Sequence, residues 1–306
     1  MVWLSGLLPY DYCEQVMERI GERYVSDSSI WRQTQRYGVK MEAEINRQRQ
    51  QVSVERIQLP DARHDHARRK TMSMDGGMVN IRHEGWRELK VGAVFDVEKR
   101  LERNPQTQQL DEMARGVNVN YTAVLGSKDA FRPALWALAV QHDLPTARNR
   151  SVVADGALWI WDVAEDVCPD GTQVVDWFHA VEHLSEAAHA LYPDDRNIKK
   201  RHRWLKTHKN HLYMGRVHKI MTALHRRNRA DLALYFERHQ RRMQYLEFRE
   251  NGLPIGSGTV ESGVKQYKQR LCGTGMRWNS DQAQRMLVIR SVTLSDEFDE
   301  LWQKVA

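Results

Sequence analysis

Three acidic residues stand in local contexts that suit metal-dependent chemistry. Asp75 in TMSMDGGM and Asp155 in SVVADGAL each follow a short apolar run typical of a buried strand and precede a glycine. Glu261 in GSGTVES opens an amphipathic stretch that predicts a helix. Carboxylates that meet at one edge of a mixed sheet can hold two Mg²⁺ ions, and two such ions roughly 4 Å apart promote phosphoryl transfer. The pattern therefore predicts a nuclease or a DNA transferase.

Each of these residues also has a purely structural interpretation. Asp-Gly at a strand end is a common turn, and a glutamate in the first turn of a helix is favoured by capping and by the helix dipole. Ser257 and Ser262 of the same GSGTVES block could cap the helix or contact a phosphate. For any one of these residues alone a structural role is favoured, whereas the combination of the three carboxylates favours a metal site.

Three longer segments carry a family resemblance. They are SMDGGMVNIRHEGWRELKVGAVFDV, VVADGALWIWDVAEDVCPDGTQVVDWFHAVEHL and YLEFRENGLPIGSGTVESGVKQYKQRLCGTGMRWNSDQAQRMLVIRS. Together they resemble the catalytic half of bacterial insertion-sequence transposases of the ISKra type, which are relatives of the Mutator-like transposases. The resemblance runs from about Thr71 to about Ser291, and its most specific block is GSGTVES followed by GMRW. It implies an RNase H-like fold with a DDE triad, in which Asp75, Asp155 and Glu261 are the catalytic carboxylates and the metal ligands.

The resemblance also implies a reaction and its partners. Two Mg²⁺ ions, for which Mn²⁺ is an accepted substitute, would promote attack of water on the phosphodiester at the element end. The freed 3′-hydroxyl would then attack target DNA, without a covalent enzyme intermediate. The expected partners are double-stranded DNA, as terminal repeats and as target, and further copies of the chain in a homo-oligomer on DNA. Because family members commonly carry more chain before this region, we also expect part of an N-terminal DNA-binding region to be missing. The alternatives are a truncated or domesticated transposase that only binds DNA, and an RNase H-fold nuclease.

Two further residues come directly after the fifth expected strand, in DWFH. This string matches a D/C-x-x-H motif of Mutator-like enzymes, so the resemblance implies auxiliary roles for Asp176 and His179. His179 would contact DNA or orient a catalytic carboxylate, and Asp176 could simply cap the next helix. The same segment contains HxxEH, from His179 to His183, with Glu261 as a third ligand 78 positions later, which is the pattern of inverted zinc proteases. That remote alternative leaves both DG motifs and the GSGTVES block unexplained.

The charge of the chain is unevenly distributed. Between residues 196 and 242 there are 15 Lys and Arg against Asp231 and Glu237, a local balance of +13 that leaves −7 for the rest of a chain whose net charge is +6. Such a segment predicts contact with a polyanion, although a solvated helical face is the alternative. Four interleaved aromatic residues, Trp204, Tyr213, Tyr235 and Phe236, suggest that bases or sugars stack there as well. The predicted DNA-binding cations are Lys199, Lys200, Arg201, Arg203, Lys206, Lys209, Arg226, Arg227 and Arg229.

The elements that must position these residues follow one order. Strands are predicted at 71–79, 88–97, 120–125, 151–154 and 172–175, with helices at 128–142 and 157–167 and a last catalytic helix at 261–271. The fold class is therefore α/β: an RNase H-like mixed five-stranded sheet flanked by helices, with an all-helical insertion before the last catalytic helix. Trp159, Trp161 and Trp177 are expected to pack helices on this sheet.

The predicted organisation has four parts. Residues 1–66 form a helical N-terminal region with helices at 12–24 and 29–51, residues 67–183 the first part of the catalytic core, 184–251 the basic insertion and 252–306 the C-terminal helices. The first two helices are either a truncated helix-turn-helix, with Ile30, Trp31, Thr34 and Tyr37 on or beside the second helix, or a hairpin packed on the core. Residues 63–70 are expected to be a basic linker.

Composition excludes several other classes. Cys13, Cys168 and Cys272 are scattered and form no CxxC pair, so neither a disulfide framework nor a zinc ribbon is encoded. The sequence has no run of about 20 apolar residues that would span a bilayer, and its start lacks the pattern of a signal peptide. A cytoplasmic, nucleoid-associated protein of DNA transposition and recombination, without a membrane partner, is expected.

Overall fold

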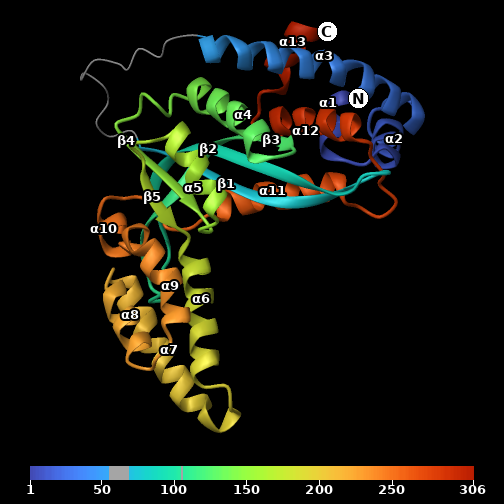
Figure 1. Ribbon diagram of the computed structural model, residues 1–306. Helices are drawn as coiled ribbons and strands as arrows, with labels where there is room; N and C mark the ends of the chain where they lie inside the picture. The colour runs from blue at the N-terminus through green and yellow to red at the C-terminus, as the bar shows by residue number, and fades with distance from the viewer. Residues whose placement is uncertain (55–68, 105) are drawn as a thin grey trace.

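A five-stranded mixed sheet forms the centre of the computed structural model, which describes residues 1–54, 69–104 and 106–306 (Figure 1). The strand order is β3-β2-β1-β4-β5, where β1, β2 and β3 are antiparallel and β4 pairs in parallel with both β1 and β5. The strands are β1 Arg69–Ile81, β2 Gly85–Arg103, β3 Leu110–Leu125, β4 Asn149–Ala154 and β5 Thr172–Val175. The predicted mixed five-stranded sheet is confirmed, and it is compatible with an RNase H-like fold.

The hairpin of β2 and β3 is much longer than predicted. Its ladder runs from the pair Leu89–Leu125 to the pair Arg103–Leu110, whereas the sequence indicated only residues 88–97 and 120–125. The outer half carries mostly exposed and charged side chains, so it lacks the alternating apolar pattern that marks a half-buried strand. Main-chain hydrogen bonds hold this part together, and side-chain patterns do not reveal them.

Helices cover both faces of the sheet. On one face, α4 Lys128–Gln141 and α5 Leu158–Val167 share a core with strand residues such as Met72 and Met74. On the other face, α11 Gly258–Leu271 and α12 Ser280–Leu294 pack on Val79 and Val91. Trp161 and Trp177 are buried and Trp159 is partly buried in the first core, which confirms their expected packing role.

A glycine lets α11 lie close to the sheet. A Cβ atom at Gly263 would come within 2.6 Å of the ring of Tyr121 on β3, a distance that real Cβ contacts do not reach. The missing side chain therefore permits the close approach of helix and strand. This approach matters because the first turn of α11 carries Glu261.

The N-terminal helices pack on the core. They are α1 Val2–Leu7, α2 Tyr10–Arg19 and α3 Asp27–Val54, and α3 joins a third apolar cluster with α12 and with α13 Phe298–Val305. Of the four residues predicted on or beside the second helix, Ile30 and Thr34 are buried at 0% and 1% exposure, whereas Trp31 is 40% exposed. The structure therefore agrees with the packed hairpin. The predicted linker falls on 63–68, outside the described residues, and on the first two residues of β1.

A helical leg projects from the β5 edge of the sheet (Figure 1). It consists of α6 Trp177–Leu191, α7 Ile198–Tyr213, α8 Val217–His225, α9 Ala230–His239 and α10 Tyr245–Glu250, with 3₁₀ turns at Asp195–Asn197 and Gln240–Met243. The predicted boundary at residue 183 falls inside α6, because this helix begins at the sheet and continues into the leg. Within the described ranges, no helix has both the length and the apolar character needed to cross a membrane.

Candidate active site

The register of the parallel strands brings three aspartates to one level. Ser73 of β1 pairs with Val153 of β4, the last pair of that ladder, and the same register continued for two residues puts Asp75 at the level of Asp155. The charge of Asp155 acts on the pKa of Asp75, which agrees with this placement. β4 and β5 are also in parallel register, and Asp176, which directly follows β5, lies opposite Asp155. Because side chains alternate along a strand, residues at matching positions of neighbouring strands share a face. The three carboxylates therefore line one face near the edge where β4 and β5 end.

Glu261 reaches this group from the first turn of α11. Ser257, which precedes the helix, places its hydroxyl 2.7 Å from Glu261 Oε1 and 3.0 Å from Asp176 Oδ2, and its backbone N–H also donates to Asp176 Oδ2. The serine thus joins the N-terminus of α11 to the N-terminus of α6. The sequence indicated a helix cap or a phosphate contact for Ser257, and its bridging position between two carboxylates was not predicted.

Asp176 and His179 of the DWFH motif stand beside Glu261. Asp176 is fully buried and accepts the backbone N–H of His179 at 2.9 Å, which confirms its predicted role as a helix cap. Burial raises the pKa of Asp176, and the N–H donors of Ser257 and His179 oppose that rise. Among the described residues, Asp176, His179 and Glu261 form a group whose ligand atoms all lie within 4.8 Å of one another.

The half-buried carboxylate of Asp75 is influenced by the charges of Asp155, Glu261 and His179. Burial raises the pKa of Asp75, and the charges of Asp155 and Glu261 raise it further, while the Gly76 N–H at 2.6 Å and His179 lower it. Several carboxylates held close together repel one another unless a cation neutralises them. Oxygen donors of this kind suit hard divalent ions such as Mg²⁺ or Mn²⁺ and do not select soft metals. The donor set therefore fits the predicted ions.

The leg supplies a second layer behind Asp155. Gly156 has a φ of +104°, and a Cβ atom there would lie 3.4 Å from the hydroxyl oxygen of Tyr235 and 3.6 Å from His239 Nε2, both on α9. Burial, with the charges of nearby cations, lowers the pKa of His239 to about 4, so this ring is neutral near pH 7. The sequence placed neither α9 residue at the site, because the contact joins segments some 80 positions apart.

The HxxEH residues do not assemble a zinc site in the described parts of the chain. The His183 ring lies on the ring of Tyr235 with 3.7 Å between centroids, and its Nδ1 is 3.3 Å from Glu186. His179 Nδ1 is 3.2 Å from Glu182, one turn along the same helix. His183 is absent from the group that includes His179 and Glu261. The inverted zinc-protease alternative therefore gains no support.

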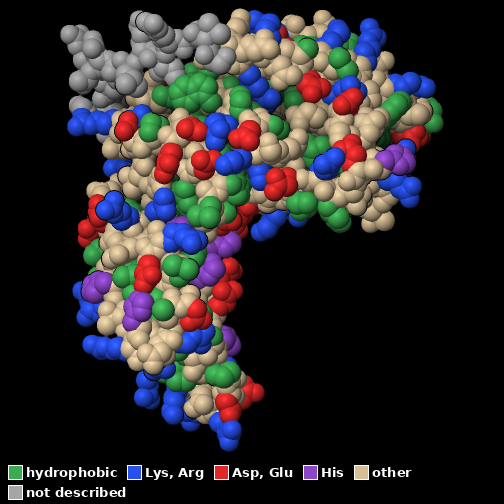
Figure 2. Space-filling model, viewed as in Figure 1, with side chains coloured by type: hydrophobic (Ala, Val, Ile, Leu, Met, Phe, Trp, Pro, Cys, Tyr) green, Lys and Arg blue, Asp and Glu red, His purple; other side chains and the backbone are tan. Residues whose placement is uncertain are grey.

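The site lies in the angle between the sheet and the leg, where histidine and acidic side chains gather on the surface (Figure 2). The predicted DNA-binding cations lie on the leg. They differ in whether the side chain is exposed or is held by contacts within the leg. Lys199, Lys200, Arg203 and Lys206 of α7 are exposed, as is Arg226, and Lys209 is partly exposed. Three others are engaged within the leg: Arg201 donates to the Tyr192 carbonyl, Arg227 lies over the Tyr192 ring, and Arg229 pairs with Asp231 at 2.7 Å.

The aromatic residues of the leg correct one expectation. Trp204, Tyr213 and Phe236 are buried at 7%, 5% and 1% exposure, and Tyr235 lies between α6 and α9 against His183. They form the core of the leg and are not free to stack on DNA. The physical reason is that a highly charged helical segment still needs apolar side chains to hold its helices together.

Comparison with known proteins gives a partial match. No family model matches the chain. Over 33% of its length the chain is 34% identical to the transposase for insertion sequence element IS1557 from Mycobacterium tuberculosis, in strains CDC 1551 and H37Rv. The matched part covers 27% of these relatives, so the chain spans about a quarter of their length. The similarity is therefore to one part of these transposases.

Proposed function

We propose that the chain is the catalytic part of a DDE transposase that cleaves the end of an insertion sequence and joins it to target DNA. The observation that supports the proposal is electrostatic and geometric: the charges of Asp155 and Glu261 both raise the pKa of Asp75, and the register of the neighbouring parallel strands, continued past their last pair, puts Asp75 and Asp155 at one level. The ISKra-type subtype rests on the GSGTVES and GMRW blocks.

In this proposal Asp75, Asp155 and Glu261 hold divalent ions. When bound, two Mg²⁺ ions supply charge neutralisation at the phosphate and activation of the attacking oxygen. The chain's own contribution is rigidity. Asp75 is fixed within a central strand and Asp155 directly after another, and Ser257 ties Glu261 to the buried Asp176. Such fixed geometry lowers the barrier because little reorganisation is needed when the DNA arrives.

DNA is held, in the same proposal, by the leg together with the angle in which the carboxylates lie. The exposed lysines and arginines of α7 contact the phosphate backbone without reading sequence. A duplex bound along the leg would reach the carboxylates at the base of α6. A homo-oligomer would pair the two ends of the element.

A labelled duplex that carries the terminal repeat and flanking DNA tests this function. In Mg²⁺ the protein should cut at the repeat end to leave a 3′-hydroxyl, and it should then join that end to a supercoiled plasmid. Cleavage without joining would indicate an RNase H-fold nuclease. Binding without cleavage would indicate a DNA-binding remnant and would contradict the proposal.

A further inference from the structure

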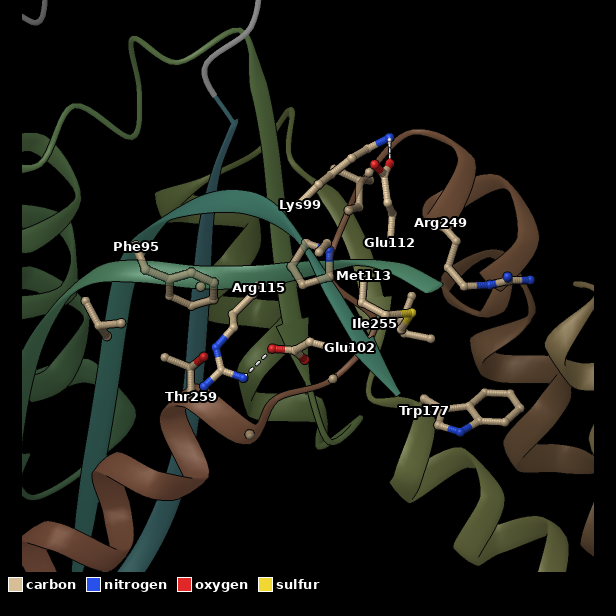
Figure 3. Close-up of a pocket in the computed structure, with 18 of the residues that line it drawn as sticks. Phe95, Lys99, Glu102, Glu112, Met113, Arg115, Trp177, Arg249, Ile255 and Thr259 are labelled. Carbon is tan, nitrogen blue, oxygen red and sulfur yellow. Dashed lines mark hydrogen bonds and ion pairs between the residues drawn. The ribbon is translucent and has the colours of Figure 1, made fainter. Parts of the chain in front are cut away.

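A cavity of about 490 Å³ opens beside the carboxylate site (Figure 3). Its walls are the outer part of the β2–β3 hairpin, the connection 252–258 and the first turns of α6 and α11. Phe178, between Trp177 and His179, lines it from α6, and Thr259 and Ser262 on either side of Glu261 line it from α11. The cavity is therefore lined by the two helix N-termini that carry Asp176 and Glu261.

Phe178 is a large aromatic residue that lines the cavity and is exposed to solvent. Its side chain is 58% exposed, whereas the neighbouring Trp177 is buried at 1%. A Cβ atom at Gly256 would lie 3.8 Å from the Phe178 ring and 3.7 Å from Asp176 Oδ2, so both groups border Gly256. An exposed aromatic face at the mouth of a cavity provides a platform on which a planar ligand can stack.

Cations of the hairpin face the same cavity. Lys99 pairs with Glu112 at 3.6 Å and Arg115 pairs with Glu102 at 2.5 Å. Figure 3 shows both pairs on the hairpin strands, with Arg115 beside Thr259. The two cationic side chains are 48% and 55% exposed. Exposed ion pairs contribute little to stability, so a phosphate can replace either carboxylate at small cost.

We propose that this cavity receives one unpaired nucleotide of the DNA strand that enters the carboxylate site. The base stacks on Phe178, and its phosphate contacts Lys99 or Arg115. The volume suits a single small ligand, and the wall combines an aromatic face with cations, which is how proteins bind single-stranded nucleic acid. The inference rests on the proposed function, because it assumes that the carboxylates act on DNA.

One consequence distinguishes this site from simple backbone binding. Opening a base pair next to the cut costs free energy, so DNA that is already unpaired there should bind more tightly than a full duplex. The preference should depend on Phe178, because stacking requires an aromatic ring and is tolerant of base sequence. Contacts of the leg with the duplex should not depend on it.

Binding of two fluorescent DNA probes to the full chain tests the inference, with EDTA present so that no cleavage occurs. One probe is a fully paired duplex, and the other has the same sequence but an unpaired arm of about five nucleotides, within the range that one single-strand-binding module covers. The native protein should prefer the forked probe. Phe178→Ala should bind the forked probe about tenfold more weakly, because the base loses its stacking partner, and should bind the duplex as before. Phe178→Trp should retain the preference.

The matched control is Tyr24→Ala, which removes an aromatic side chain of 70% exposure outside the cavity and should leave both affinities unchanged. Equal binding of the forked probe by native protein and Phe178→Ala would overturn the inference. Cleavage in Mg²⁺ is measured separately. If the protein cleaves DNA but Phe178→Ala binds the forked probe like the native protein, the nucleotide-binding role of the cavity is refuted and the proposed function is not. If the preference for the forked probe depends on Phe178 but no cleavage occurs, the proposed function is refuted and the nucleotide-binding role of the cavity is not.

Discussion

At the scale of single residues, the candidate site concentrates like charges in a partly buried place. Burial raises the pKa of Asp75 and of Asp176, and Asp155 and Glu261 add to the rise at Asp75. A carboxyl whose folded pKa is raised stabilises the fold only while it is protonated, and that contribution is lost as the pH rises through the folded pKa. Without metal, these carboxyl groups therefore lower the stability of the fold once they ionise.

Neutralising Asp75 should consequently stabilise the metal-free protein. We expect Asp75→Asn to raise the melting temperature in EDTA at pH 8 by about 2 °C, the shift that about 1 kcal/mol gives in a chain of this size. The gain should become smaller as the pH is lowered toward 4, because the raised pKa of Asp75 favours its protonated form at low pH. Thermal melts at both pH values measure it, with the exposed Asp299→Asn as a control. A variant that is less stable than the native protein at pH 8 would contradict the electrostatic account.

Ser257 is a positioning residue for Glu261, and removal of its hydroxyl tests that role. Ser257→Ala removes the hydrogen bond to Glu261, and because a hydrogen bond to a charged group contributes about 1.5–3 kcal/mol we expect cleavage to fall at least tenfold. The Mg²⁺ concentration for half-maximal cleavage should rise as well, since Glu261 would be less well held. Ser257→Thr keeps the hydroxyl and should recover most of the activity. An alanine variant with native metal dependence would show that the serine is only structural.

Some of these residues could be predicted from sequence and others could not. Asp75 lies within a strand behind a buried run, Asp155 directly follows another strand, and Glu261 lies in the first turn of a helix, so the local pattern indicated these three positions as candidates. The bridge made by Ser257 and the contact of Tyr235 with Gly156 depend on how distant segments meet. Nothing in the local sequence of either residue indicates that meeting.

At the scale of elements, strands that are buried could be predicted from the sequence, and exposed strand segments could not. The inner strands are buried and carry apolar runs, so their existence and order were predicted correctly. The outer half of the β2–β3 hairpin is exposed and charged and was missed. That half forms one wall of the cavity beside the site, so the cavity could not be anticipated either.

The close packing of α11 on β3 gives a prediction at this scale. Gly263→Ala would place a methyl group 2.6 Å from the Tyr121 ring, so the helix that carries Glu261 would have to shift. Overpacking typically costs about 1–3 kcal/mol, partly offset by the better helix propensity of alanine, and we expect a net loss of about 1 kcal/mol in urea unfolding.

The same helix offers a matched control for that substitution. A Cβ atom at Gly258 meets nothing within 4 Å, so Gly258→Ala should be neutral or slightly stabilising. Cleavage should fall in Gly263→Ala because Glu261 moves. If the two variants proved equally stable, the packing of α11 would not be as tight as described.

At the scale of the whole molecule, charge and shape are divided between two parts. Residues 196–242 of the leg carry a local balance of +13, and the carboxylates lie where the leg meets the sheet (Figure 2). The aromatic residues among the cations hold the leg together, so the cations alone remain for binding to DNA. Composition predicted this charge distribution, but only the three-dimensional packing separates the free cations from those engaged within the leg.

A quadruple alanine variant tests whether the exposed cations of the leg bind DNA; it replaces Lys199, Lys200, Arg203 and Lys206. Arg201 is kept, because it donates a hydrogen bond to the Tyr192 carbonyl within the leg. Binding should weaken for all duplexes alike. The slope of log affinity against log salt should become shallower by up to about 0.9 for each phosphate that the variant no longer neutralises. A variant in which Arg19 and Arg23, exposed at and just beyond the end of α2, become Ala should keep the native slope. Identical slopes for the quadruple variant and the native protein would mean that DNA is held elsewhere.

The central claim is that Asp75, Asp155 and Glu261 act together as the metal-holding catalytic group. Cleavage of an end-labelled terminal-repeat duplex in Mg²⁺ by Asp75→Asn, Asp155→Asn and Glu261→Gln tests it most directly. A neutral amide cannot replace an anionic ligand for a hard divalent ion, so each variant should bind DNA normally and lose cleavage by at least about a thousandfold. Near-native cleavage by any one of the three would remove that residue from the group and contradict the account.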